Sequence, residues 1–217
     1  MYFTYGKTET DYLKRKCKKL AAVIDAVGPI ARKLDDDLFD AVVHHIVGQQ
    51  ISSKAQATIW RRIKENLGPI NAQTVLAAGA EKLQAFGISF KKADYILDFA
   101  RKVQSGAFDL QAVAHMPDDE AIAALVSLRG IGVWTAEMLL LFCLARPNVF
   151  SYDDLAIQRG LRMLYHHRKI TKPLFEKYRK RFSPYGSVAS LYLWAVSGGA
   201  VPGMRDYAPQ KTVKRGK

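Results

Sequence analysis

Several features are scarce in this sequence of 217 residues, and each absence excludes a class of protein. The two cysteines, Cys17 and Cys143, are too few for the four thiolates of an iron–sulfur cluster or a cysteine-rich zinc site. No apolar run approaches the roughly 20 residues that cross a bilayer, and none near the start is typical of a signal peptide. We therefore expect reduced cysteines, no membrane attachment and a cytoplasmic protein.

Acidic residues are also in short supply. Twenty Asp and Glu face 33 Lys and Arg, which gives a net charge of +13 and an isoelectric point near 9.7. An excess of this kind fits a protein that binds a polyanion such as nucleic acid, but it also occurs in proteins that are merely basic. Charge alone leaves both interpretations open.

Strand-like alternation is rare, and apolar residues recur at three- and four-residue spacing almost throughout, which predicts an all-α fold. The length allows one domain or two small lobes that share a cleft. We expect a helical segment over 1–34 that packs on a core of 35–200, followed by a basic and mobile tail over 201–217. Helices are predicted over 10–26, 36–47, 52–66, 72–78, 80–85, 91–104, 118–127, 133–145, 154–166, 171–181 and 185–197.

One connection between helices stands out. Gly130 and Gly132 allow a tight turn, and Ile131 between them can fill the space between the flanking helices. Such a turn directs backbone N–H groups and the start of the next helix outward, where they bind phosphate without side-chain charge. The alternative is an ordinary helix connection that contains glycine. The surrounding pattern, Leu-x-Gly-Ile-Gly-x-x-Thr-Ala over 128–136, favours the phosphate-binding hairpin.

Residues 128–136, followed by Val-Phe-Ser-Tyr-Asp-Asp-Leu-Ala-Ile-Gln-Arg-Gly over 149–160, resemble the signature of the HhH–GPD superfamily. That name describes a helix-hairpin-helix followed by a Gly/Pro-rich loop and an aspartate. Within it, the sequence is most similar to the 3-methyladenine DNA glycosylase II family, whose early motif resembles His-Ile-Val-Gly-Gln-Gln-Ile-Ser over 45–52. The similarity implies a two-lobed helical fold with the helix-hairpin-helix (about 118–145) at the cleft and a catalytic loop and helix over 146–166. We expect a short form of this family, without the N-terminal β-rich domain that its larger bacterial members carry.

The resemblance implies a monofunctional DNA glycosylase of base excision repair that acts as a monomer on double-stranded DNA containing damaged bases. It would flip out an alkylated purine, of the 3-methyladenine or 7-methylguanine type, and hydrolyse its N-glycosidic bond to leave an abasic site. Asp154 matches the family's catalytic aspartate, whereas Asp153 is better explained as a helix cap. An alkylated purine is cationic and leaves readily, so one ionised carboxylate suffices to stabilise the positive charge that develops on the sugar.

Trp134 stands where superfamily members that also cut the backbone carry a Schiff-base lysine. The resemblance therefore implies hydrolysis by water alone. Trp134 would line the base pocket, because a cationic purine stacks well on an indole, although a core tryptophan is the alternative. Met138, one helical turn away, and Tyr185 would line the same pocket. We place Trp194 and Tyr192 in the core.

The DNA contacts follow from the same resemblance. Gln50 occupies the position of the wedge that fills the gap left by the flipped nucleotide, where the family commonly has a large apolar residue, and a polar helix cap is the alternative. The phosphate-binding site would combine the hairpin with two lysines at the start of a helix. The alternative is that these lysines are simply solvated at the helix start. The residues of this site are Gly130, Gly132, Thr135, Lys91 and Lys92.

We expect no cofactor or metal that is bound by side chains. His44 and His45 are interpreted as structural, because adjacent helical residues face different sides and no third metal ligand is evident. The hairpin backbone at Leu128 and Ile131 could hold a structural Na⁺ or K⁺. Two other functions stay open: a glycosylase for hypoxanthine or an oxidised base, and a non-catalytic helix-hairpin-helix module that binds DNA.

Overall fold

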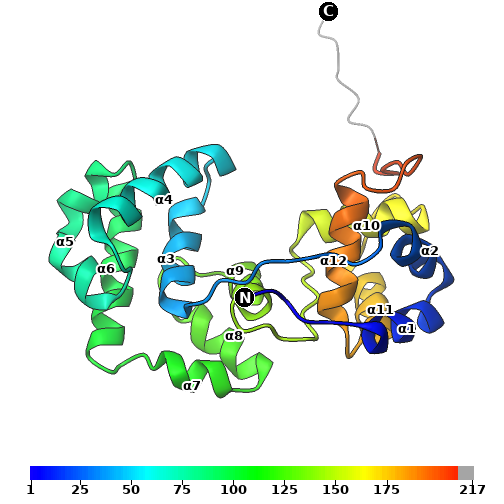
Figure 1. The fold of residues 1–217 in the computed structure, drawn as a ribbon, viewed down its shortest axis with the longest axis horizontal. Helices are drawn as coiled ribbons and strands as arrows, with labels where there is room; N and C mark the ends of the chain where they lie inside the picture. The colour runs from blue at the N-terminus through cyan, green and yellow to red at the C-terminus, as the bar shows by residue number, and fades with distance from the viewer. Residues whose placement is uncertain (210–217) are drawn as a thin grey trace, which may run out of the picture. The chain divides into compact units, whose positions relative to one another are not determined.

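A computed structural model describes residues 1–209, and the end of the predicted basic tail, 210–217, lies outside the described residues. The described chain folds into twelve α-helices and no β-strand, which confirms the predicted all-α class (Figure 1). No helix in this part of the chain is both long enough and apolar enough to cross a bilayer.

The chain divides into two compact units. The first consists of Met1 and Lys33–Ala145, and the second of Tyr2–Arg32 together with the described residues from Arg146 onward. The predicted boundaries at 34 and 200 divide the chain into segments that are each continuous in the sequence. The compact units are discontinuous in the sequence, because the N-terminal helices pack on the C-terminal ones.

Seven helices form the first unit. They are α3 (Leu38–Gly48), α4 (Ser53–Leu67), α5 (Ala72–Ala85), α6 (Phe90–Gln104), α7 (Leu110–His115), α8 (Asp118–Val126) and α9 (Val133–Phe142). The mostly apolar α3 is central, since it packs on α4, α6 and α9. Gly79 interrupts α5 with φ 71° and ψ 175°, as the two predicted helices 72–78 and 80–85 require. The short α7 is absent from the predicted set.

The second unit contains α1 (Lys7–Lys16), α2 (Lys18–Val27), α10 (Leu155–Tyr165), α11 (Lys172–Phe182) and α12 (Gly186–Ser197). The predicted single helix 10–26 is broken at Cys17, whose extended backbone ends α1 and whose sulfur caps α2. The largely buried α12 packs closely on α10. A Cβ on Gly160 would come within 2.4 Å of the Leu193 carbonyl oxygen, so this close helix contact requires glycine.

The first residues of the predicted tail are anchored on the end of α10. Asp206 accepts two hydrogen bonds of 2.7 Å from the Arg162 guanidinium, and Tyr207 stacks on His166 with ring centroids 4.5 Å apart. Two residues of the tail that was expected to be mobile, Asp206 and Tyr207, therefore contact the second unit.

His45 lies on α3, where burial, helped by the charge of His44, lowers its pKa to about 4. We expect the free energy of unfolding to fall as the pH drops from about 6.5 towards 4. Over that window the unfolded chain binds a proton that folded His45 does not, so acid favours unfolding by up to about 3 kcal/mol. Urea unfolding between pH 7 and 4 measures this. His45→Gln should flatten the pH dependence, and an equally steep curve in that variant would contradict the assignment.

Candidate active site

The hairpin between α8 and α9 depends on glycine at only one of its two glycine positions. Gly130 has φ +85°, and a Cβ there would lie 2.4 Å from the Tyr95 ring. Ile131 N donates to Leu128 O at 3.1 Å and closes the turn. Gly132 has an ordinary φ of −98° and open space around its Cβ position. The expectation that both glycines serve the tight turn is therefore corrected: backbone strain excludes other residues at Gly130 alone.

The start of α9 is suited to an anion. Gly132, the N-cap, has no side chain to accept the N–H groups of the first turn, and these groups have no acceptor within the helix. Val133 and Trp134 are 47% and 42% exposed, so this turn is open at the surface. Thr135 is buried, which leaves its backbone N–H, rather than its hydroxyl, as the predicted phosphate contact.

The turn after α3 is tied to the hairpin within the first unit. The Gln49 side-chain nitrogen donates to Gly130 O at 2.6 Å. The Lys92 ammonium donates to Val47 O at 2.8 Å and to Gln49 O at 2.6 Å. Gln50, the predicted wedge, is exposed and holds φ +57°, a conformation that is uncommon outside glycine. The turn that carries Gln50 is thus held by hydrogen bonds from two side chains, those of Gln49 and Lys92.

The two lysines of the predicted phosphate-binding site differ in position. Lys92 is half-buried, burial lowers its pKa, and its ammonium binds the carbonyls at the end of α3. This replaces the predicted phosphate contact with a structural one, because unpaired carbonyls and the negative end of a helix dipole attract a cation. Lys91 is exposed, with its amine 5.8 Å from the Tyr95 ring centre, and stays a predicted phosphate ligand.

In the second unit, Asp154 forms the N-cap of α10 and is only 7% exposed. Its Oδ1 atom accepts hydrogen bonds from Ala156 N at 2.9 Å, Ile157 N at 2.8 Å and Trp194 Nε1 at 3.1 Å. Three converging donors fix the direction of the carboxylate. The neighbouring Asp153 is exposed, so the fold distinguishes the two aspartates.

Trp194 is the site residue that sequence reasoning missed. It was expected in the core, yet its indole nitrogen reaches Asp154 from α12, 40 residues further along the chain. The close packing of α10 on α12 at Gly160 makes this contact possible. The sequence of α12 is apolar on most sides, so no periodic signal separates Trp194 from its core neighbours.

The predicted base-pocket residues have different surroundings. Trp134 is well exposed on the first turn of α9, which excludes the alternative of a core tryptophan. Met138 is only 3% exposed, so it is almost fully covered by its neighbours, unlike Trp134. Tyr185, which precedes α12, is half-buried and packs edge-to-face on Tyr12 at 5.1 Å. Tyr185 lies in the second unit and the other two in the first, so a common pocket stays a prediction.

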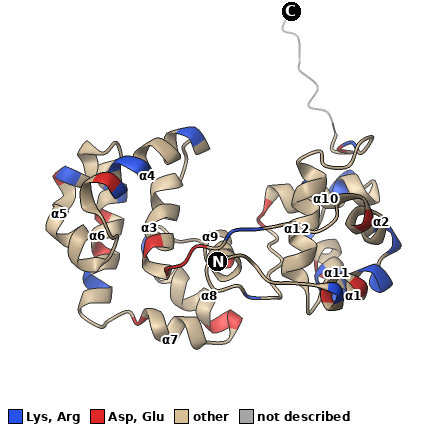
Figure 2. Cartoon of the chain, viewed as in Figure 1, with Lys and Arg blue, Asp and Glu red and all other residues tan. Residues whose placement is uncertain are grey.

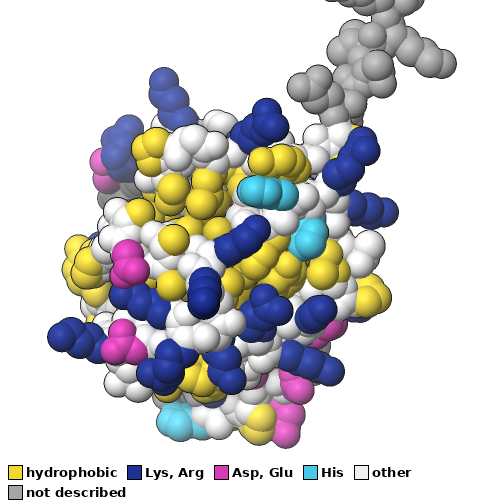
Figure 3. Space-filling model, turned by 90° about the vertical axis from the view of Figure 1, so that its right-hand side faces the viewer, with side chains coloured by type: hydrophobic (Ala, Val, Ile, Leu, Met, Phe, Trp, Pro, Cys, Tyr) yellow, Lys and Arg dark blue, Asp and Glu magenta, His cyan; other side chains and the backbone are white. Residues whose placement is uncertain are grey.

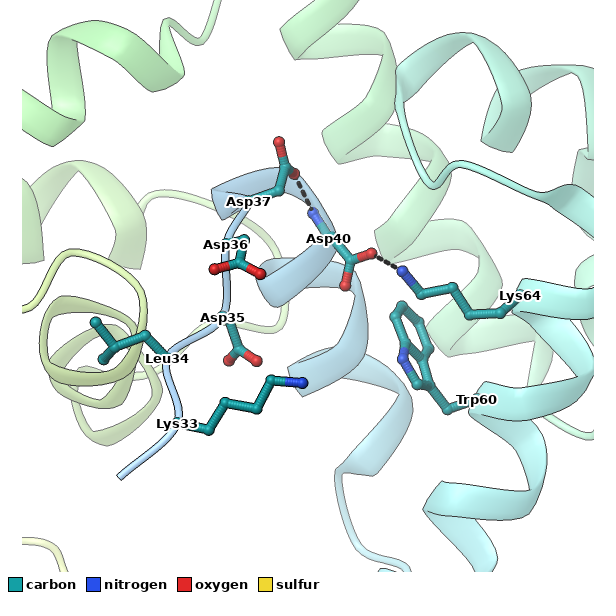
Figure 4. A pocket seen from close by; sticks show the side chains of 8 residues that line it. All are labelled: Lys33, Leu34, Asp35, Asp36, Asp37, Asp40, Trp60 and Lys64. Atoms are coloured by element: carbon teal, nitrogen blue, oxygen red, sulfur yellow. Dashed lines mark hydrogen bonds and ion pairs between the residues drawn. The ribbon is translucent and has the colours of Figure 1, made fainter. Parts of the chain in front are cut away.

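A depression of about 270 Å³ in the first unit is acidic and does not suit DNA (Figure 4). At the edge of the depression, Lys64 forms an ion pair with Asp40, and its amine lies over the Trp60 ring. Burial, and to a smaller extent the carboxylates of the depression, raise the pKa of the nearby Cys143 to about 12. Among the described residues, no group of three His, Cys, Asp or Glu could hold a metal ion. The depression is lined by Lys33, Leu34, Asp35, Asp36, Asp37, Asp40, Trp60 and Lys64.

Comparison with known proteins relates this chain to base excision DNA repair proteins. Residues 43–184 match the family described as HhH-GPD superfamily base excision DNA repair protein. YfjP of Bacillus subtilis, provisionally named a DNA-3-methyladenine glycosylase, is 28% identical over 81% of this chain, which spans 64% of its length.

Two solved structures have the same fold. The DNA-3-methyladenine glycosidase of Bacillus halodurans is 30% identical with a TM-score of 0.84, over 95% of this chain and 97% of that one. The Schizosaccharomyces pombe 3-methyladenine DNA glycosylase Mag1, solved in complex with abasic DNA, is 26% identical with a TM-score of 0.78, over 90% and 98% of the two chains.

Proposed function

Because this chain belongs to the HhH-GPD superfamily of base excision DNA repair proteins, we propose that it is a monofunctional DNA glycosylase that releases alkylated purines from duplex DNA. The substrates are purines of the 3-methyladenine and 7-methylguanine type. The observation that carries the proposal is Asp154, a carboxylate oriented by three N–H donors at the start of α10. The relatives named for 3-methyladenine support the choice of substrate.

The hairpin supplies the grip on the DNA backbone. The N–H groups at the start of α9 bind one phosphate without reading the base sequence, as suits an enzyme that examines all DNA. Gln50, on its braced turn, fills the space left by the flipped nucleotide and offers an amide to the orphaned partner base. Lys91 adds charge to the grip.

Asp154 acts on the sugar. As the bond between C1′ and the cationic base breaks, positive charge develops on the deoxyribose, and the fixed carboxylate stabilises it and orients the attacking water. The exposed indole of Trp134 stacks on the departing base. Since Trp134 has no amine, no Schiff base forms with the sugar, and the product is an abasic site in an intact strand.

The hairpin carbonyls fit a monovalent cation. Leu128 O accepts one hydrogen bond, from Ile131 N, and a carbonyl oxygen has a second lone pair that an ion could use. Leu128 and Ile131 would hold Na⁺ or K⁺, whose charge would reinforce phosphate binding. We also propose that the protein acts as a monomer in the cytoplasm, associated with the nucleoid.

Incubation with duplex DNA that carries methylated purines tests the proposal. We expect free 3-methyladenine, no strand cleavage, and no covalent protein–DNA adduct when borohydride is added. Release of hypoxanthine or an oxidised base instead would assign a different lesion. Binding without release of any base would identify a non-catalytic DNA-binding module, and a trapped adduct would contradict the monofunctional mechanism.

A further inference from the structure

The positive charge of this protein is concentrated in one of its two units. The first unit has 11 Lys and Arg against 13 Asp and Glu, whereas the described part of the second has 18 against 7. The unit that carries the hairpin is therefore slightly acidic. Figure 2 shows basic segments recurring along α1, α2 and α11. The phosphate-binding hairpin alone does not account for the polyanion partner that the composition predicts.

Much of this charge gathers on α1, α2 and α11, and α1 contacts both of the other helices. Figure 3, which looks at the side of the molecule that carries these helices, shows Lys and Arg side chains spread across it and fewer Asp and Glu. We call this surface the basic face. Its main cations are Arg15, Lys16, Lys19, Lys177, Lys180 and Arg181.

Three of the four acidic residues on these helices have partners of their own, and the fourth, Asp11, is exposed on α1. Asp25 pairs with Lys14 at 2.5 Å, and Glu176 lies 3.5 Å from Arg179. Glu9 accepts a hydrogen bond from Gly6 N at the start of α1. None of the six main cations forms an ion pair with a described residue, so the basic face has charge to offer an external anion.

Aromatic rings hold some of these cations close together. Lys19 Nζ lies 5.7 Å from the Tyr165 ring centre, and the Arg181 guanidinium lies 5.4 Å from that of Tyr178. The two rings are themselves 4.4 Å apart, and their hydroxyls are bonded to the Cys17 sulfur and the His167 ring. Two positive charges from different helices are thus fixed over adjacent rings, an arrangement that a bridging anion stabilises.

Lys19 and Arg181 of the basic face lie at the opposite end of α10 from Asp154 within the same unit. Asp154 caps the start of α10, and Tyr165 is its last residue, so the 11-residue helix separates them. At about 1.5 Å per residue this is roughly 16 Å, or the rise of about five base pairs of duplex. A backbone contact at Lys19 and Arg181 would therefore fall outside the nucleotide on which Asp154 acts.

We infer that the basic face binds the phosphate backbone of duplex DNA away from the lesion, as a contact that is independent of base sequence. The inference takes its ligand, duplex DNA, from the proposed function. Charge complementarity favours DNA over a protein partner, because protein interfaces need a buried apolar centre. The exposed large hydrophobic residues of the described second unit, Tyr2 and Leu155, lie outside α1, α2 and α11.

Neutralising three of these cations tests the inference. In the triple variant Lys19→Gln, Lys177→Gln, Lys180→Gln, affinity for undamaged duplex, measured by fluorescence anisotropy at several salt concentrations, should fall. The slope of log K against log salt should become shallower by up to about 2.7, because each lost phosphate contact contributes about 0.9. A matched control removes three cations of the first unit, Arg61→Gln, Lys82→Gln and Arg101→Gln, and should keep the full slope.

Single-turnover base release at saturating enzyme should not change in the triple variant, since none of its positions is among the residues proposed to act on the base or the sugar. An unchanged salt slope would overturn the inference, as would an equal loss in the control. If the triple variant does not fold, Lys180→Gln alone should lower the slope by about 0.9. A shallower slope in a protein that releases no base would reject the glycosylase proposal and leave the basic face intact.

Discussion

Replacing Asp154 with asparagine should reduce base release by at least about 10²–10³-fold while leaving duplex binding and folding intact. The charge that stabilises the developing sugar cation is lost, but the amide oxygen of asparagine can still accept the hydrogen bonds from Ala156 N, Ile157 N and Trp194 Nε1. Asparagine is also as good an N-cap as aspartate. Single-turnover excision from methylated duplex, alongside anisotropy binding of undamaged duplex, measures both effects.

Asp153→Asn is the matched control, since it removes the same charge from the adjacent, exposed residue. It should keep near-normal turnover. Near-normal turnover in Asp154→Asn would remove Asp154 from the mechanism, and a loss of similar size in both variants would indicate a general electrostatic effect on DNA binding.

Replacing Gly130 with alanine should destabilise the hairpin by about 2–4 kcal/mol. A left-handed backbone costs alanine about 1–2 kcal/mol, and a Cβ placed 2.4 Å from the Tyr95 ring forces a further shift of packed atoms. Because Gln49 binds the Gly130 carbonyl, the turn that presents Gln50 should shift as well. Urea unfolding reports the loss of stability, and we expect duplex affinity to fall at least about 10-fold, since 1.4 kcal/mol of lost binding suffices for that.

Gly132→Ala provides the comparison within the same turn. Its backbone is extended and its Cβ position is open, so the free energy of unfolding should change by no more than about 0.5 kcal/mol. Equal destabilisation by the two substitutions would show that the turn does not depend on the left-handed conformation of Gly130.

The sequence predicted those parts of the fold and site whose cause is local. Three- and four-residue spacing gave the all-α class, and the predicted boundary between helices 72–78 and 80–85 coincides with the kink at Gly79. The hairpin was recognisable because its glycines and the helix after it are contiguous. Asp154 was singled out because it matches the aspartate of a family motif that lies in contiguous residues, and its catalytic role stays a prediction.

The parts that were wrong or missed depend on distant residues. Lys92 was expected at a phosphate and instead binds the end of α3, 45 residues away. Trp194 was expected in the core and instead orients Asp154. Nothing in the spacing around either residue indicates these partners, because helix packing alone brings them within reach.

The sequence by itself determined the helices, the hairpin and the family, since each is written in contiguous residues. The tertiary structure decided which glycine is indispensable, which donors orient the carboxylate, and that the positive charge belongs to the second unit. The physical reason is that conformational preference acts between neighbours in the chain, whereas steric fit, hydrogen bonding and charge act between neighbours in space.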